Sequence, residues 1–240
     1  MSGAEHPRGD LGRNLTWGLC DRLGRAIVVG DYRDRPFPTE AEIERMHGVS
    51  RSVTREAVKM LAAKGLVGAR PKQGTFVRPE AAWNLFDTDV LRWLLERRSS
   101  LTLLRQFGDM RLAVEPAAAA LAARQASDPQ RAAITAGLDR MRAAERGDDA
   151  VLEADIAFHA AILAATNNPF FAQFRDVVVT ALNTSIRFTN RLSGRSASIA
   201  DHAAVHDAIL DTDADAARHA MADLINKALA LIEQSAKESE

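Results

Sequence analysis

The sequence contains a single cysteine, Cys20, and no apolar run long enough to span a bilayer. An internal disulfide is therefore excluded, and a membrane-spanning helix, which needs about 20 apolar residues, is not expected. Aromatic residues make up only 5% of the 240 residues, so Ala, Leu, Ile and Val must supply most of the core. The first residues, MSGAEHPRGDLGR, lack the apolar segment of a signal peptide, and we expect a short disordered arm in a cytoplasmic protein.

The formal net charge is only −1, but the charged residues are unevenly distributed along the chain. Between Val49 and Pro79, seven basic side chains accompany one acidic side chain, Glu56, which gives this segment a net charge of +6. The remainder of the chain is correspondingly acidic. A basic segment on an acidic body indicates a polyanionic partner for that segment. The alternative is a solvated basic surface with no partner.

The basic segment follows a recognisable order of elements. A helix is predicted over 11–29, and TEAEIERMHG has a capping box at Thr39 and Glu42 and a stop at Gly48. The turn GVS then leads into RSVTREAVKMLAAKG, with Ser50 as N-cap. Two short helices joined by a tight turn form a helix-turn-helix, and LVGARPKQGTFVRP predicts a two-stranded wing behind them.

The second of these short helices carries the side chains expected to contact DNA. Arginines near the start of a recognition helix make paired hydrogen bonds to guanine in the major groove. Hydroxyl groups between them serve phosphates or base edges, and the wing reaches a neighbouring groove or the backbone. A helical hairpin with an exposed basic face is the alternative. The candidate DNA contacts are Arg51, Ser52, Thr54, Arg55, Lys72 and Gly74.

From Val90 onward the apolar spacing is helical throughout, and short cap and turn signals separate the segments. Helices are expected near 89–98, 101–126, 129–146, 149–166, 169–192, 196–211 and 214–236. Short connections between amphipathic helices predict an antiparallel helical bundle. The fold class is therefore mainly α, with a DNA-binding domain at 11–78, a linker at 79–88 and an all-helical domain at 89–236.

One helix of the predicted bundle places two polar side chains on its apolar face. Asp155 and His159 lie one turn apart in DIAFH, and IADHAAVHDAIL directs His202 and His206 toward the interior. Carboxylate and neutral imidazole groups that converge in a core are typical ligands of a divalent metal ion, such as zinc, nickel or manganese. A metal-free ion pair between Asp155 and a buried His159 is the alternative.

At the level of motifs, residues 11–78 resemble the winged helix-turn-helix of the GntR family of bacterial regulators. The resemblance is carried by FPTEAEIERMHGVSRSVTREAVKMLAAKGLVGARPKQGTFV. Residues 80–236 are similar to the FCD-type ligand-binding domain of FadR-like members. Two positions depart from the family pattern: Arg33-Asp34 replaces the usual Pro-Gly, and Ala41 stands where a DNA-contacting arginine is common.

The resemblance implies roles for buried polar residues of the second domain. Asp155, His159 and His202 match metal ligands, with zinc as the first candidate, while the family's fourth ligand histidine falls on Leu224 and is absent. Arg111 matches an arginine of the first long helix and would pair with an effector carboxylate. Further candidate effector contacts are Asn183 and Arg187, one turn apart in TALNTSIRFTNR, and His206.

The implied function is a homodimeric transcriptional repressor that binds a double-stranded DNA operator. A small carboxylate effector, such as the aldonate galactonate, would release it, since WNLFDTDVLRWLLE resembles the linker of sugar-acid-sensing members. One alternative is a regulator of this family with a metal-free pocket for a fatty acyl thioester or another organic acid. A metal-dependent enzyme is disfavoured, because the sequence has no His-Glu-x-x-His pair, nucleophile elbow or phosphate loop.

Overall fold

The computed structural model describes residues 8–71, 74–97, 100–193 and 198–238, and side chains within 14–71, 74–97, 101–183 and 198–234. The chain divides into two compact units, Met1–Arg97 and Arg98–Glu240. Helices make up most of the described residues, and the described strands form one two-stranded sheet. The predicted mainly α fold is confirmed.

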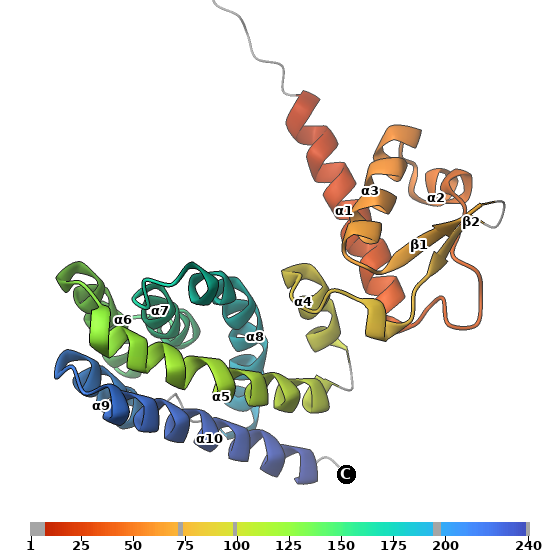
Figure 1. Cartoon of the computed structure of the whole chain (residues 1–240). Helices are drawn as coiled ribbons and strands as arrows, with labels where there is room; N and C mark the ends of the chain where they lie inside the picture. The colour runs from red at the N-terminus through yellow and green to blue at the C-terminus, as the bar shows by residue number, and fades with distance from the viewer. Residues whose placement is uncertain (1–7, 72–73, 98–99, 194–197, 239–240) are drawn as a thin grey trace, which may run out of the picture. The chain divides into compact units, whose positions relative to one another are not determined.

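The first unit consists of helices followed by a hairpin. Its elements are α1 (Arg8–Val29), α2 (Glu40–His47), α3 (Arg51–Ala63), β1 (Val67–Arg70), β2 (Gly74–Val77), the 3-10 turn η1 (Glu80–Ala82) and α4 (Thr88–Glu96). In Figure 1, α1 lies alongside α3, and the β1–β2 hairpin follows the end of α3. The strands are antiparallel, with Val67 opposite Val77 and Arg70 opposite Gly74. This is the predicted order of helix, turn, helix and wing.

Helix α4 packs on α1 within the first unit. A Cβ atom at Gly24 would lie 2.3 Å from the Trp93 ring, so the ring occupies space that only glycine leaves open. The Trp93 Nε1–H donates to the Asp21 carboxylate at 2.9 Å, and Arg92 binds the same carboxylate. The predicted division begins the helical domain at residue 89, whereas these contacts place α4 with the first unit.

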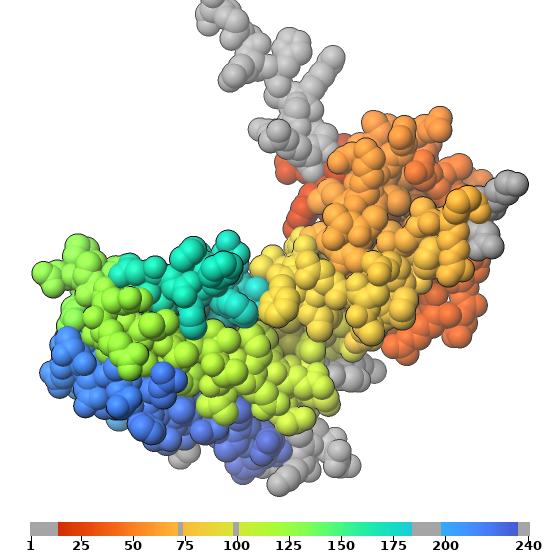
Figure 2. All heavy atoms as spheres, viewed as in Figure 1, coloured from red at the N-terminus to blue at the C-terminus, as the bar shows by residue number. Residues whose placement is uncertain are grey.

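The second unit contains helices only, among its described residues. They are α5 (Ser100–Gln125), α6 (Asp128–Glu145), α7 (Val151–Ala164), α8 (Pro169–Ser193), α9 (Ile199–Leu210) and α10 (Ala214–Glu238). Helix α5 runs along α10, α6 pairs with α7, and α9 packs on α10 (Figure 1). Figure 2, drawn in the same view with all atoms as spheres, shows atoms of α10 lying directly against atoms of α5.

The core of the second unit is built from small and aliphatic side chains, as the low aromatic content requires. Phe158 is its largest fully buried side chain, and it belongs to one apolar cluster with alanines of α5 and aliphatic side chains of α6, α7 and α9. Helices α6 and α7 approach closely at Gly137, where an added Cβ would lie 2.9 Å from the Phe158 Cα. Close approach fixes the backbone beside His159, the next residue.

Within the described part of the chain, no helix combines the length and apolar character needed to cross a membrane. Cys20 is a free, buried thiol, and burial raises its pKa to about 11. It packs as a small apolar residue in the first unit.

Candidate functional site

Local contacts define the start of α2 and the turn between α2 and α3. The Glu42 N–H donates to Thr39 Oγ1 at 3.3 Å and the Thr39 N–H donates to the Glu42 carboxylate at 2.8 Å, which is the predicted capping box. Gly48 ends α2 with φ of 62°, and Ser50 caps α3 through Val53 N–H at 3.4 Å. Glycine is favoured at that left-handed turn because it has no side chain to clash.

The exposed face of α3 presents the predicted arginines to solvent. Arg51 and Arg55 are exposed, and neither has a hydrogen-bond or ion-pair partner among the described residues. Ser52 is also exposed, and its hydroxyl lies 3.0 Å from that of Ser50. Free guanidinium groups at the start of a recognition helix are available for phosphates and base edges.

Thr54 corrects one predicted DNA contact. Its side chain is 0% exposed, and its hydroxyl donates to the Ser50 carbonyl at 3.2 Å. The residue shares the inward face with Ala57 and Leu61, at helical spacings of three and seven. Thr54 therefore holds the first turn of α3 instead of reaching DNA.

At the wing, Gly74 has φ of 81°, and no atom lies within 4 Å of the position that a Cβ would take. Gly74 is therefore favoured by its left-handed backbone conformation and not by a lack of room for a side chain. The Arg70 guanidinium lies over the Phe76 ring at 4.3 Å from its centre. Lys72, the other predicted wing contact, lies outside the described residues.

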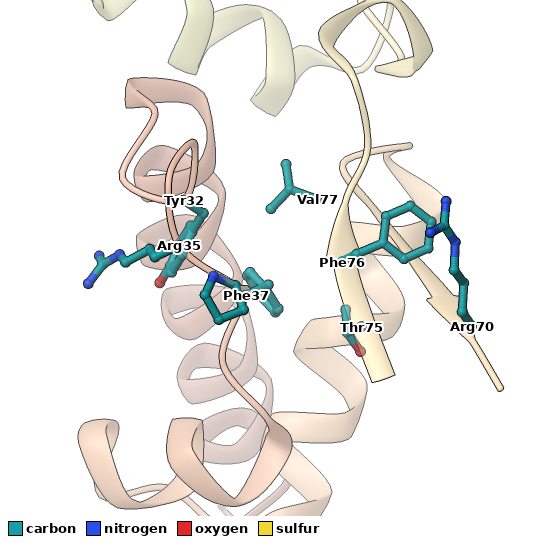
Figure 3. A pocket seen from close by; sticks show the side chains of 8 residues that line it. Tyr32, Arg35, Phe37, Arg70, Thr75, Phe76 and Val77 are labelled. Carbon is teal, nitrogen blue, oxygen red and sulfur yellow. The ribbon is translucent and has the colours of Figure 1, made fainter. Parts of the chain in front are cut away.

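A cavity of about 280 Å³ lies beside the hairpin of the first unit. Figure 3 shows Tyr32 and Phe37 facing Thr75 and Val77 across it, whereas Arg35 points away from it. Arg35 stacks over Tyr32 at 4.9 Å from the ring centre. The other lining arginine, Arg70, lies over Phe76, so neither arginine points into the cavity and we assign it no ligand.

In the second unit, the three residues predicted as metal ligands come together in the core. Asp155 and His159 project from α7 and His202 from α9, and one ligand atom from each lies within 4.8 Å of the others. The His202 Nε2 is 2.9 Å from Asp155 Oδ1, and the His159 Nε2 is 3.9 Å from the same oxygen. All three side chains are buried.

These spacings fit a common cation. Zinc is bound by imidazole nitrogen and carboxylate oxygen at about 2.0–2.2 Å, so ligand atoms around one ion lie roughly 3–4 Å apart. The His202 Nδ1 donates to the Ser198 carbonyl at 2.8 Å, which leaves the lone pair of the neutral ring on Nε2. This Nε2 has no aligned hydrogen bond among the described residues, despite its closeness to Asp155. A lone pair facing a carboxylate is repulsive unless a cation or a proton lies between them.

A further acidic side chain, Glu115 of α5, contacts the cluster. Its Oε2 lies 2.6 Å from His159 Nδ1, and it also pairs with Arg111 one turn away, at 3.2 Å from Nη2. Both members of the Arg111–Glu115 pair are buried. Burial alone would raise the pKa of Glu115, but Arg111 and His159 outweigh it and lower the pKa to about 2. Glu115 is therefore a carboxylate at neutral pH.

Asp155 is ionised for a similar reason. Burial raises its pKa, but the neighbouring His202, His159 and Arg111 side chains outweigh burial and lower the pKa below its usual value. Sequence reasoning identified Asp155 but did not include Glu115 in the site. The i,i+4 spacing of Arg111 and Glu115 was the available signal, whereas the contact of Glu115 with His159 joins residues 44 positions apart in the chain.

The other predicted effector contacts are placed differently. His206 faces α6, where its Nε2 lies 2.9 Å from the Thr135 hydroxyl, and its Nδ1 lies 2.8 Å from Asp207. His206 thus lies outside the three-residue cluster, and its contact with an effector stays a prediction. Asn183 is half-buried and donates to the Val179 carbonyl at 3.0 Å. The side chain of Arg187 lies outside those that the structure describes. Leu224 belongs to the apolar core.

Comparisons with known proteins identify both units. A family model described as bacterial regulatory proteins, gntR family, matches residues 18–77, and one described as FCD domain matches residues 106–227. The chain belongs to the GntR family of transcriptional regulators and carries an FCD domain. The first unit is therefore its DNA-binding part, and the protein is a regulator of transcription and not an enzyme.

Relatives of this GntR-family regulator cover most of its length. It is 36% identical to the galactonate operon transcriptional repressor of Escherichia coli over 88% of this chain and 94% of that protein. It is 34% identical to the uncharacterized HTH-type transcriptional regulator YieP of Escherichia coli, over 85% and 90% of the two chains. The solved structure of E. coli McbR/YncC aligns with a TM-score of 0.51 at 18% identity, covering 92% and 98%, which supports the fold.

Proposed function

We propose that this regulator is a repressor of sugar-acid catabolism that a small carboxylate effector releases from its operator. The effector class is an aldonate such as galactonate, bound beside a divalent metal ion in the second unit. The observation that carries the proposal is the buried convergence of Asp155, His159 and His202. The 36% identical relative named as a galactonate operon repressor supports the choice of effector.

Asp155, His159 and His202 would hold the metal through one carboxylate oxygen and two imidazole nitrogens. Zinc is the first candidate for this donor set, and nickel and manganese are also suited to it. When bound, the metal supplies a positive centre that an effector carboxylate or hydroxyl oxygen can contact. Leu224 offers no ligand at the position where the family has a fourth histidine, so the three-residue set leaves coordination positions for the effector.

The charge of the cluster favours an anion. Its ionised groups are the carboxylates of Asp155 and Glu115 and the guanidinium of Arg111, and a dication with neutral imidazoles turns their sum from −1 to +1. Burying uncompensated charge is costly. A monocarboxylate effector brings the sum to zero. Arg111 uses Nε and Nη2 for Glu115, and its remaining N–H groups are donors for the effector carboxylate.

The DNA-binding half of the proposal rests on the exposed face of α3. Arg51 and Arg55 would read base edges in the major groove, Ser52 would contact phosphate or base, and the wing at Lys72 and Gly74 would contact the backbone or the adjacent groove. We propose a homodimer on a palindromic operator, because paired recognition helices match two half-sites one helical turn apart. A protein that reads bacterial operators works in the cytoplasm.

For release to follow, the effector must bind the conformation that does not bind DNA more tightly than the one that does. Thermal unfolding with zinc chloride and galactonate, with and without chelator, tests the sensing half. A ligand present at 100 times its Kd stabilises the native state by about 2.7 kcal/mol. We expect a galactonate shift that chelator abolishes and that Asp155→Ala loses, whereas Glu153→Ala, an exposed acidic residue on the same helix, retains it.

A metal-free version of the pocket is the second candidate, because the 2.9 Å contact between His202 and Asp155 also suits an ion pair with protonated histidine. It predicts a purified protein without stoichiometric metal. Its response to an organic acid or acyl thioester would be insensitive to chelator. Metal analysis beside the same unfolding assay separates the two candidates.

A further inference from the structure

The two histidines of the cluster are arranged alike. Each directs Nε2 toward Asp155 and places Nδ1 next to an oxygen that can accept a proton. For His202 that oxygen is the backbone carbonyl of Ser198, 2.8 Å away. For His159 it is the carboxylate of Glu115, 2.6 Å away. Both acceptors lie on the side of the imidazole ring opposite the ligand nitrogen.

We propose that Glu115 is a positioning residue that fixes His159 in the tautomer with the proton on Nδ1, so that Nε2 is available as a metal ligand. Arg111 in turn holds the Glu115 carboxylate, and the three residues act as one unit. This inference deepens the proposed metal site and rests on it for its role in sensing.

The distances decide between the two tautomers. With the proton on Nδ1, that nitrogen lies 2.6 Å from an ionised oxygen, close enough for a charge-assisted hydrogen bond. With the proton on Nε2, its nearest acidic oxygen is Asp155 Oδ1 at 3.9 Å, too far for a hydrogen bond. The Nδ1 lone pair would then face the Glu115 carboxylate. The N–H is not squarely aligned with Oε2, but the difference between 2.6 and 3.9 Å outweighs this.

The Glu115 carboxylate is itself held in place by Arg111. Arg111 binds it through Nε and Nη2, and the side chains of both residues are less than a tenth exposed. A paired guanidinium leaves the carboxylate little rotational freedom, so Oε2 stays beside His159. Outer-shell carboxylates that orient ligand histidines commonly account for a 10- to 100-fold change in metal affinity, about the size expected here.

Nitrogen-15 NMR of histidine-labelled protein without added metal tests the tautomer directly, with the His159 signals assigned from a His159→Asn variant. We expect Nδ1 protonated and Nε2 unprotonated in the wild type, and a changed tautomer population in Glu115→Gln. Competition with a chromophoric chelator should show zinc affinity weaker by about 10- to 100-fold in Glu115→Gln. The control is Asp109→Asn, which removes an exposed carboxylate from the same helix and should change neither measurement.

Glu115→Gln leaves Arg111 buried without its counter-charge, so the double variant Arg111→Met/Glu115→Gln is measured beside it and should show the same loss of the Nδ1–H tautomer. A wild-type signal with the proton on Nε2 overturns the proposal, and this result requires no variant. An unchanged tautomer and unchanged zinc affinity in a folded Glu115→Gln protein also overturn it. If the wild type binds no zinc while the tautomers behave as expected, the metal-dependent function fails and the positioning role of Glu115 stands.

Discussion

Gly137→Ala probes the fixed contact between α6 and α7 that places His159. In an ordinary helix this substitution stabilises by about 1 kcal/mol, because alanine has the better helix propensity. Here the added Cβ would lie 2.9 Å from Phe158 Cα and 3.1 Å from Phe158 N. These are backbone atoms that no side-chain rotation can move away, and overpacking of this kind costs about 1–3 kcal/mol.

The two effects together predict that Gly137→Ala lowers the free energy of unfolding of the second unit by up to about 2 kcal/mol. Pushing α7 away at Phe158 also displaces His159 relative to Glu115 and Asp155, so zinc affinity should fall. Urea unfolding followed by circular dichroism and chelator competition measure the two effects.

Gly18→Ala is the matched control. It makes the same change inside α1, where the nearest atom to the new Cβ is Arg22 Nη1 at 3.7 Å, the end of a flexible side chain. It should stabilise the first unit by about 0.5–1 kcal/mol. If Gly137→Ala stabilised the protein as Gly18→Ala does and left zinc affinity unchanged, the close approach of α6 and α7 would be refuted, together with its role in placing His159.

Three further predictions concern the first unit. Arg55→Ala should weaken operator binding by about 1–3 kcal/mol, measured by fluorescence anisotropy at fixed salt, and leave galactonate stabilisation unchanged; loss of both would show that Arg55 supports the fold. Thr54→Val removes a buried hydrogen bond, so it should lower stability by about 1 kcal/mol and leave the preference for operator bases unchanged. A weaker preference at one base pair would show instead that Thr54 contacts DNA. Burial raises the pKa of Asp89, but Lys64 and Arg92 outweigh it and lower the pKa below 3.8. Ionised Asp89 therefore stabilises the first unit fully at pH values above its pKa in the unfolded chain, and this stabilisation is lost as pH falls through its pKa in the folded protein. Urea titrations at acid pH should show a free energy of unfolding that falls as pH falls, and Asp89→Asn should make that fall smaller.

Local sequence signals predicted most of the fold because the interactions that start and end these helices join residues close together in the sequence. The capping box at Thr39 and Glu42 and the N-cap at Ser50 are satisfied within four residues, so the sequence alone specifies them. Helical apolar spacing likewise located the helices of the second unit to within a few residues of their observed ends. The placement of α4 was different, since it depends on the fit of Trp93 over Gly24, 69 positions apart.

Residue spacing also explains what was missed in the site. Asp155 and His159 were found because an i,i+4 pair on an apolar face is visible in sequence. Thr54 was placed on the DNA face for its chemistry, although its spacing to Ala57 and Leu61 already indicated the interior. His206 shares a face with His202, but one turn further along α9 the neighbouring helix is α6, with Thr135 as partner. Only packing reveals such a change of neighbour.

Glu115, Asp155, His159 and His202 come from α5, α7 and α9, so the cluster exists only when these helices are packed together. In the unfolded chain Asp155 and His159 are only neighbours in sequence, four positions apart, and His202 lies 43 residues after His159, so there is no preformed site. The affinity for the proposed metal would then be part of the folding free energy of the second unit. The buried Arg111–Glu115 pair contributes little net stability by itself, and we interpret it as the device that keeps His159 correctly oriented. A metal ion and an effector carboxylate bound to this cluster would change the stability of the packing between α5, α7 and α9. In the proposed repressor, that change in packing is what links effector binding to DNA binding.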